Sequence, residues 1–126
     1  MFKSKNVVKK HENCTICDHL PRNFNCNDRF LVYQFTCKYC SAFYIGETSR
    51  PFFNRYKEHE RSLRHGNFTS ALSEHALKAH DQLSVAICSF DLEILHRCRN
   101  AVEARLVEAR AIRTRGPPLN RKHEKA

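Results

Sequence analysis

The sequence predicts a small α+β domain in which a three-stranded antiparallel sheet is flanked by helices. Its 126 residues suit a single domain. Three short runs either concentrate the β-branched and aromatic residues of strands or alternate apolar with polar residues: 30–35, 42–46 and 89–96. Three longer segments carry apolar residues at helical spacing: about 51–66, 71–79 and 101–114. The order strand, strand, helix, helix, strand, helix is typical of an α+β domain.

The first 28 residues are expected to lie outside this domain. Residues 1–13 are polar and basic and have no periodicity, which is typical of a mobile basic arm. Residues 14–28 set three cysteines among Asn, Pro, Arg and Asp, which indicates an irregular loop. We expect the domain itself to span residues 29–121 and a charged tail to follow at 122–126.

The first two strands are expected to form a hairpin, because only a short polar connection with Cys37 and Cys40 separates them. Ser49 is expected to cap the next helix, with Pro51 at a position where a helix start tolerates proline. Gly66 and Asn67 end this helix. Its apolar face is formed by Phe52, Phe53, Tyr56 and Leu63, with Arg55 and His59 one turn apart on the border of that face.

The remaining elements have similar local signals. Thr69 or Ser70 is expected to begin the helix at 71–79. The third strand turns Phe90, Leu92 and Ile94 to one side. Asn100 is expected to cap the last helix, which Gly116-Pro117-Pro118 ends. The predicted apolar face of that helix consists of Ala101, Val102, Leu106, Ala109 and Ile112.

The charge of the chain predicts an anionic partner. The formal net charge is +9, and nucleic acid is the commonest partner of such a surface. The seven cysteines follow no apolar leader segment, so we expect a reducing, intracellular environment and no membrane association. In that environment paired cysteines favour metal binding over disulfides.

Two groups of residues have the spacing of zinc ligands. Cys37-x-x-Cys40 and His75-x4-His80 supply the ligand types of a tetrahedral site, which would connect the hairpin to the second helix. Of the two histidines, one is expected at or beyond the helix end. A second zinc could be held by Cys14, Cys17 and Cys26, with His11 or His19 as the fourth ligand. Cys88 and Cys98 are expected to be core cysteines.

A further set of residues has side chains that could bind a phosphate and a hard cation. Tyr33 and Tyr44 lie on the two hairpin strands, and Arg55 and His59 follow on the next helix. Arginine binds phosphate through paired N–H groups, whereas a tyrosine, with a pKa of about 10, needs a nearby cation to act as a base. The last helix offers two carboxylates, Glu103 and Glu108, and the small apolar neighbours of Glu108 favour it as the ligand of a hard cation such as Mg²⁺.

These residues resemble the GIY-YIG endonucleases. The resemblance rests on Leu31-Val32-Tyr33, on Tyr44-Ile45-Gly46-Glu47-Thr48 and on Arg55-x3-His59, and it extends to Glu108 and Leu119-Asn120. It covers about residues 29–121. The cysteine pair between the two half-motifs and the later SALSEHALKAH resemble the endonuclease of Penelope-like retroelements. Leu31 and Val32 depart from the Gly and Ile of the wider family, as in that branch.

The resemblance implies a role for each residue. Tyr33 would activate the attacking water as a general base or through its hydrogen bonds, with Tyr44 in support. Arg55 would stabilise the charged phosphate, and His59 would assist proton transfer or hold the phosphate. Glu108 would bind Mg²⁺ or Mn²⁺, which would stabilise the leaving 3′ oxygen. Asn120 would brace the site, and Gly46 would let the backbone pass tightly beneath it.

The resulting hypothesis is a metal-dependent DNA endonuclease in the nucleus, whose nick would prime reverse transcription of a retroelement. A reverse transcriptase domain of a parent polyprotein is then an expected partner. The alternative left open is a non-catalytic, zinc-stapled module that binds nucleic acid. A ring-finger-like interaction domain fits less well, because such domains interleave Cys/His pairs in a sheet-poor chain.

Overall fold

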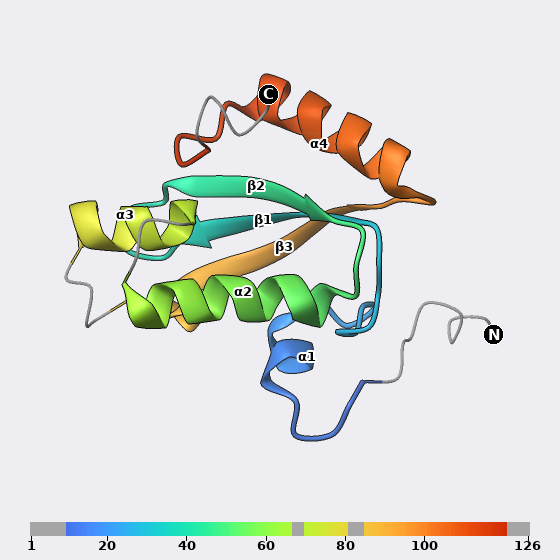
Figure 1. Cartoon of the computed structure of the whole chain (residues 1–126), viewed down its shortest axis with the longest axis horizontal. Coiled ribbons are helices and arrows are strands. Elements are labelled where there is room, and N and C mark those ends of the chain that lie inside the picture. Colours follow the sequence, from blue (N-terminus) through green and yellow to red (C-terminus); the bar gives the residue numbers. More distant parts are fainter. Residues whose placement is uncertain (1–9, 67–69, 81–84, 121–126) are drawn as a thin grey trace.

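The computed structural model describes residues 10–66, 70–80 and 85–120 and shows the predicted α+β architecture (Figure 1). Three antiparallel strands form the sheet in the order β2-β1-β3. In chain order the elements are α1 Thr15–His19, β1 Leu31–Cys37, β2 Phe43–Thr48, α2 Phe52–His65, α3 Ala71–Ala79, the 3₁₀ turn η3 Ile87–Ser89, β3 Phe90–Arg97 and α4 Ala101–Arg115. The predicted fold class is therefore confirmed.

The central strand β1 sets the register of the sheet. It pairs with β2 so that Tyr33 stands opposite Gly46, and with β3 so that Phe35 stands opposite Leu92. The register of the pairing between β1 and β3 changes between Val32 and Tyr33. Because side chains alternate across a strand, Tyr33 and Phe35 face one side of the sheet and Val32 faces the other.

The two faces of the sheet carry separate cores. Helix α2 covers the face of Tyr33 and Phe35, and α4 lies on the opposite side (Figure 1). The α2 side holds the larger cluster, in which Phe52 and Leu63 are fully buried. On the α4 side the cluster is small and centres on Val32 and Ile45. The α2 face therefore has the apolar depth to bury polar groups among aromatic rings.

Helix α2 begins differently from the prediction. Ser49 does not cap it: the residue before the first turn is Pro51, and no side chain accepts a hydrogen bond there. Instead, the N–H groups of Phe52 and Phe53 donate to the backbone carbonyls of Asp28 and Cys26, at 2.9 Å each. These carbonyls satisfy two of the donors that every helix start leaves open. The backbone of the Cys-rich segment thus caps the start of α2, in place of the side chain of Ser49.

The other helix ends agree with the sequence. The side chains of Ser70 and Asn100 accept hydrogen bonds from the third residue of α3 and α4, which confirms both caps. Gly66 and Gly116 end α2 and α4 in the left-handed conformation, with φ of 66° and 61°. The predicted contributions of Asn67 and Thr69 lie outside the described residues.

The predicted apolar face of α4 is confirmed only in part, because Ile112 packs against the core as expected and two other residues do not. Val102 and Leu106 are 58% and 67% exposed, whereas Ala104 is fully buried and Val107 packs beside it. A small side chain such as alanine lets the helix backbone approach the sheet closely, so the face with small residues turned inward. One cysteine prediction also failed, since Cys88 is exposed, whereas Cys98 is buried as expected.

The Cys-rich segment at 14–28 is more ordered than the sequence suggested. It contains the short helix α1, whose start Cys14 caps through its sulfur. Ile16 and Leu20 are buried in the same cluster as the residues of α2. The main core therefore includes residues on both sides of the domain boundary expected after residue 28. Residues 1–9 of the predicted basic arm and the charged tail at 122–126 lie outside the described residues. No helix in the described ranges has the length and apolarity needed to cross a membrane.

Candidate functional site

A buried phenol lies at the centre of the α2 face. Tyr33 is fully buried, and its hydroxyl oxygen receives the Nε–H of Arg55 at 3.2 Å. The same oxygen lies 3.1 Å from Nε2 of His59. Arg55 and His59 are one turn apart on α2, so both reach the same point of β1. Three of the residues that the sequence singled out are therefore in direct contact.

Gly46 makes room for this phenol. A Cβ atom built at position 46 would lie 2.6 Å from the hydroxyl oxygen of Tyr33 and 2.9 Å from the ring of Tyr44. Ordinary contacts between heavy atoms begin at about 3.5 Å, so only glycine fits opposite Tyr33 in this register. Space rather than backbone conformation explains this glycine, which agrees with the predicted tight passage beneath the site.

Burial keeps Tyr33 protonated. Desolvation raises the pKa of Tyr33 well above its usual value, and the charge and hydrogen bond of Arg55 lower it only in part. The expectation that a neighbouring cation would ionise this phenol is therefore not met by Arg55 alone. A protonated phenol that accepts the Arg55 N–H still has its own proton to donate, and Nε2 of His59 is the acceptor within reach.

His59 is a neutral imidazole. It is only 4% exposed, so it lies within the buried face of α2 and not on the border that the sequence suggested. Burial in the first place, and the charge of Arg55 in the second, lower the pKa of His59 to about 3. Its Nδ1 is buried without a hydrogen-bond partner among the described residues. A neutral imidazole can accept the hydrogen bond of the phenol through Nε2.

Arg55 is charged and is shared between two partners. The pKa of Arg55 is raised, and the neighbouring Tyr33 is the main cause. Besides the phenol, Arg55 binds Glu58 through Nη1 at 3.0 Å. Glu58 also accepts two hydrogen bonds from Nη2 of Arg50, at 2.9 and 2.8 Å. Neither Glu58 nor Arg50 is among the site residues that the sequence predicts, although the i,i+3 spacing of Arg55 and Glu58 is a signal for an ion pair.

Tyr44 completes the group around His59. Its ring lies 6.4 Å from that of Tyr33 and 5.7 Å from that of His59, centre to centre. Tyr44, Arg55 and His59 line a half-open hollow of about 230 Å³, whereas the buried Tyr33 does not line it and contacts Arg55 and His59 instead. A ligand in this hollow would meet Arg55 directly and Tyr33 only through its neighbours.

Glu108 lies on α4 and Asn120 lies in the chain that follows it, and neither of them lines the hollow beside Tyr44. Glu108 is half-buried, and its charge is the smallest of the named causes that raise the pKa of Tyr33. The Asn120 side chain accepts the N–H of Ile45 at 2.9 Å and donates to its carbonyl at 2.8 Å. This pair of bonds secures the outer edge of β2 next to Tyr44. Glu103, by contrast, turns away and binds Arg99.

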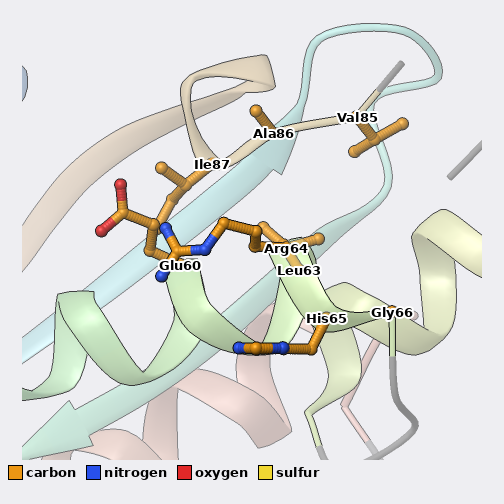
Figure 2. A pocket seen from close by; sticks show the side chains of 8 residues that line it. All are labelled: Glu60, Leu63, Arg64, His65, Gly66, Val85, Ala86 and Ile87. Carbon is orange, nitrogen blue, oxygen red and sulfur yellow. The ribbon is translucent and has the colours of Figure 1, made fainter. Parts of the chain in front are cut away.

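A second hollow lies at the other end of α2 and contains none of the predicted catalytic residues. It measures about 510 Å³ and is formed by the last turns of α2 and by residues 85–87 (Figure 2). Its lining combines the polar Glu60, Arg64 and His65 with the apolar Leu63, Val85 and Ile87. The larger hollow thus has neither the phenol nor the converging donors of the smaller one.

The predicted ligands Cys37, Cys40, His75 and His80 form one cluster, with ligand atoms that all lie within 4.8 Å of one another. Sγ of Cys37 is 3.5 Å from Nε2 of His80, and Sγ of Cys40 is 3.3 Å from Nε2 of His75. Neighbouring ligand atoms around tetrahedral zinc are about 3.3–3.8 Å apart. His80 caps the end of α3, as expected for one of the pair. The cluster has the geometry of a zinc site between the hairpin and α3.

The second cluster consists of His11, Cys14, Cys17 and Cys26. Nδ1 of His11 lies 3.0 Å from Sγ of Cys26 and 3.8 Å from Sγ of Cys17. Of the two histidines that are candidates for the fourth ligand, the structure places His11 in the cluster. His19 instead binds the Tyr56 hydroxyl at 2.9 Å and the Phe90 carbonyl at 3.0 Å.

Comparisons of the chain with protein-family models, with curated proteins and with solved structures find no match. The site therefore has to be interpreted from its own geometry and chemistry.

Proposed function

We propose that this protein is a metal-dependent DNA endonuclease of the GIY-YIG kind. One observation carries the proposal: the guanidinium of Arg55 and the imidazole of His59 converge on the buried hydroxyl of Tyr33. A purely structural tyrosine needs only one hydrogen-bond partner, whereas this phenol contacts two nitrogens, one on a cation and one on a neutral ring. The net charge of +9 supports a polyanionic substrate.

The hollow beside Tyr44 suits a phosphodiester. Arg55 is charged and borders it, so a phosphate there would be stabilised as negative charge develops in the transition state. A bound phosphate would also offset the charge of Arg55, which is the second cause of the low pKa of His59. Substrate binding would therefore make His59 more basic at the moment when a proton must be accepted.

The proton path that we propose runs through Tyr33. In the substrate complex, a shift of the side chains that cover Tyr33 would bring the attacking water to its hydroxyl, which is fully buried in the free protein. The water would then give a proton to this hydroxyl while the phenol gives its own proton to Nε2 of His59. The water oxygen then bonds to phosphorus, and the bond to the leaving 3′ oxygen breaks. This relay lets Tyr33 act through its hydrogen bonds and does not require a phenolate, which its raised pKa disfavours.

Glu108 fits a single Mg²⁺ or Mn²⁺ ion. Such ions keep most of their water and commonly bind proteins through one or two carboxylates and the substrate phosphate. Glu108 is half-buried, and its charge adds a small contribution to the raised pKa of Tyr33; we propose that a cation bound to it would reach the substrate phosphate. When bound, the ion would stabilise the charge on the leaving 3′ oxygen.

We also propose that zinc occupies both Cys/His clusters in a structural role. Four nitrogen and sulfur ligands leave no open position for catalysis. One cluster joins the hairpin to α3, and the other holds the segment whose carbonyls accept the first N–H groups of α2.

Within a cell, the nick would prime reverse transcription of a retroelement of the Penelope-like type. We propose accordingly that the protein acts in the nucleus and is linked to a reverse transcriptase domain in its parent polyprotein.

The test is nicking of supercoiled plasmid in Mg²⁺ or Mn²⁺, with zinc content measured on the same preparation. We expect Glu108→Ala and Arg55→Ala to lose at least about a hundredfold in rate. Matched controls are Glu103→Ala, the other α4 carboxylate, and Arg61→Ala, an exposed arginine of α2. If the two site variants nick as fast as the parent, the assignment of the site is wrong.

The second candidate is a zinc-stapled module that binds nucleic acid without cutting it. The full burial and high pKa of Tyr33 favour it, because a sealed, protonated phenol is also what a structural residue would be. The result that would favour this function is a zinc-loaded parent protein that binds DNA with a steep salt dependence and does not nick it in Mg²⁺ or Mn²⁺.

A further inference from the structure

Glu58 lies between two arginines at the edge of the candidate site. Its carboxylate accepts two hydrogen bonds from one nitrogen of Arg50 and one from Arg55, with all three distances between 2.8 and 3.0 Å. Arg50 comes from the loop between β2 and α2, whereas Arg55 and Glu58 lie one turn apart on α2. Both positive charges are therefore directed at one small anion supplied by the protein itself.

These three residues also connect two hollows. Glu58 lines the hollow of about 230 Å³ that contains Tyr44 and His59. Arg50 lines a neighbouring, more open hollow of about 270 Å³, and Arg55 borders both. Consecutive phosphates of a nucleic-acid strand that passed over α2 would meet Arg55 in one hollow and Arg50 in the next.

A carboxylate is a close substitute for a phosphodiester. Each presents two oxygens that share one negative charge, and the planar fork of arginine fits both. Burial raises the pKa of Glu58, but Arg50 and Arg55 outweigh this effect and lower it, so the group is anionic at neutral pH. The side chains of Arg50 and Glu58 are 51% and 40% exposed. Ion pairs with that exposure are weak and exchange easily for another anion.

We propose that Arg50 is a second phosphate-binding residue and that Glu58 is an internal competitor, which holds Arg50 and Arg55 in place until a DNA phosphate displaces it. This inference rests on the proposed function for its substrate class, a DNA backbone. It assigns roles to two residues outside the set that the sequence singled out. Binding energy from DNA is partly used to displace Glu58, so the free protein is held at reduced affinity.

The test measures binding of the full, zinc-loaded chain to a short DNA duplex by fluorescence anisotropy, without added Mg²⁺ or Mn²⁺. We expect Glu58→Gln to bind about three- to tenfold more tightly, because two weak ion pairs no longer compete with the phosphates. Arg50→Ala should bind more weakly and lower the salt dependence by about one released counterion. In the Arg50→Ala background, Glu58→Gln should have a smaller effect, because one of the two partners of Glu58 is already gone.

The matched control is Glu93→Gln, which makes the same change of charge at an exposed position on β3. Glu93 pairs with Gln34 of β1, which binds Arg115 of α4, so it lies on the side of the sheet away from α2. If Glu58→Gln binds no more tightly than Glu93→Gln, the competitor role is refuted. Full additivity of Arg50→Ala and Glu58→Gln would equally refute it. Because nothing is cleaved in this assay, its outcome is independent of the plasmid assay, and either proposal can fail while the other holds.

Discussion

Replacing Gly46 with alanine would place a methyl group where the Tyr33 phenol now lies. The added Cβ would be 2.6 Å from the Tyr33 hydroxyl oxygen and 2.8 Å from its Cζ. Since ordinary contact begins at about 3.5 Å, the phenol would have to move by roughly 0.9 Å. Tyr33 is fully buried and is held by Arg55 and His59, so the displacement would break the contacts that define the site.

The magnitude follows from overpacking and misplacement. An extra carbon in a well-packed core costs about 1–3 kcal/mol, and we expect the free energy of unfolding of Gly46→Ala to fall by that amount. A catalytic group moved by about 1 Å loses on the order of a hundredfold in rate. Unfolding in urea and plasmid nicking, measured on the same preparation, would give both values.

Gly116→Ala is the matched control for this variant. Gly116 has a φ of 61° and no atom within 4 Å of an added Cβ, so alanine there costs only the left-handed conformation, about 1–2 kcal/mol. It should lower stability and leave nicking unchanged. A Gly46→Ala variant as stable and active as the parent would refute the placement of Tyr33 over Gly46. A destabilised variant with full activity would refute the catalytic role of Tyr33.

Three further predictions concern acid, zinc and the edge of the sheet. The pKa of His59 is about 3 in the folded state and 6.5 ordinarily, so the unfolded chain binds the extra proton and stability falls as the pH drops from 6.5 towards 3. His59→Gln should lessen that loss in acid unfolding, and His65→Gln, on the surface, should not. Cys40→Ser should release one zinc and lower stability by on the order of 4 kcal/mol, the value for closing a loop of this length, whereas Cys88→Ser, also exposed, should change neither zinc content nor melting temperature. Asn120→Ala removes two hydrogen bonds to β2 and should cost about 1–2 kcal/mol in urea unfolding; an unchanged midpoint would contradict the bracing role.

The elements of the fold could be predicted because their signals are local. Period-two and helical spacing set the strands and helices, while Ser70, Asn100, Gly66 and Gly116 mark ends through bonds to their own neighbours. The candidate metal ligands followed similarly, because only two residues separate Cys37 from Cys40, and His75 lies on α3 five residues before its C-cap, His80. Local chemistry was sufficient for these features.

The side of a helix that faces the core is not a local property. Val102 and Leu106 looked like core residues on α4, yet the sheet selected the side with Ala104, which permits closer packing. The start of α2 shows the same limit. Its open donors are satisfied by the carbonyls of Cys26 and Asp28, which are more than twenty residues away along the chain.

The sequence by itself determined which chemical groups the site has, and the tertiary structure decided the state of each one. Tyr33, Arg55 and His59 could be named from their types and spacing, but burial among aromatic rings makes the phenol protonated and the imidazole neutral. Desolvation depends on what packs around a group, and these neighbours come from β1, β2 and α2 together. For the same reason only the folded chain brings Arg50 and Glu58 to the edge of the site.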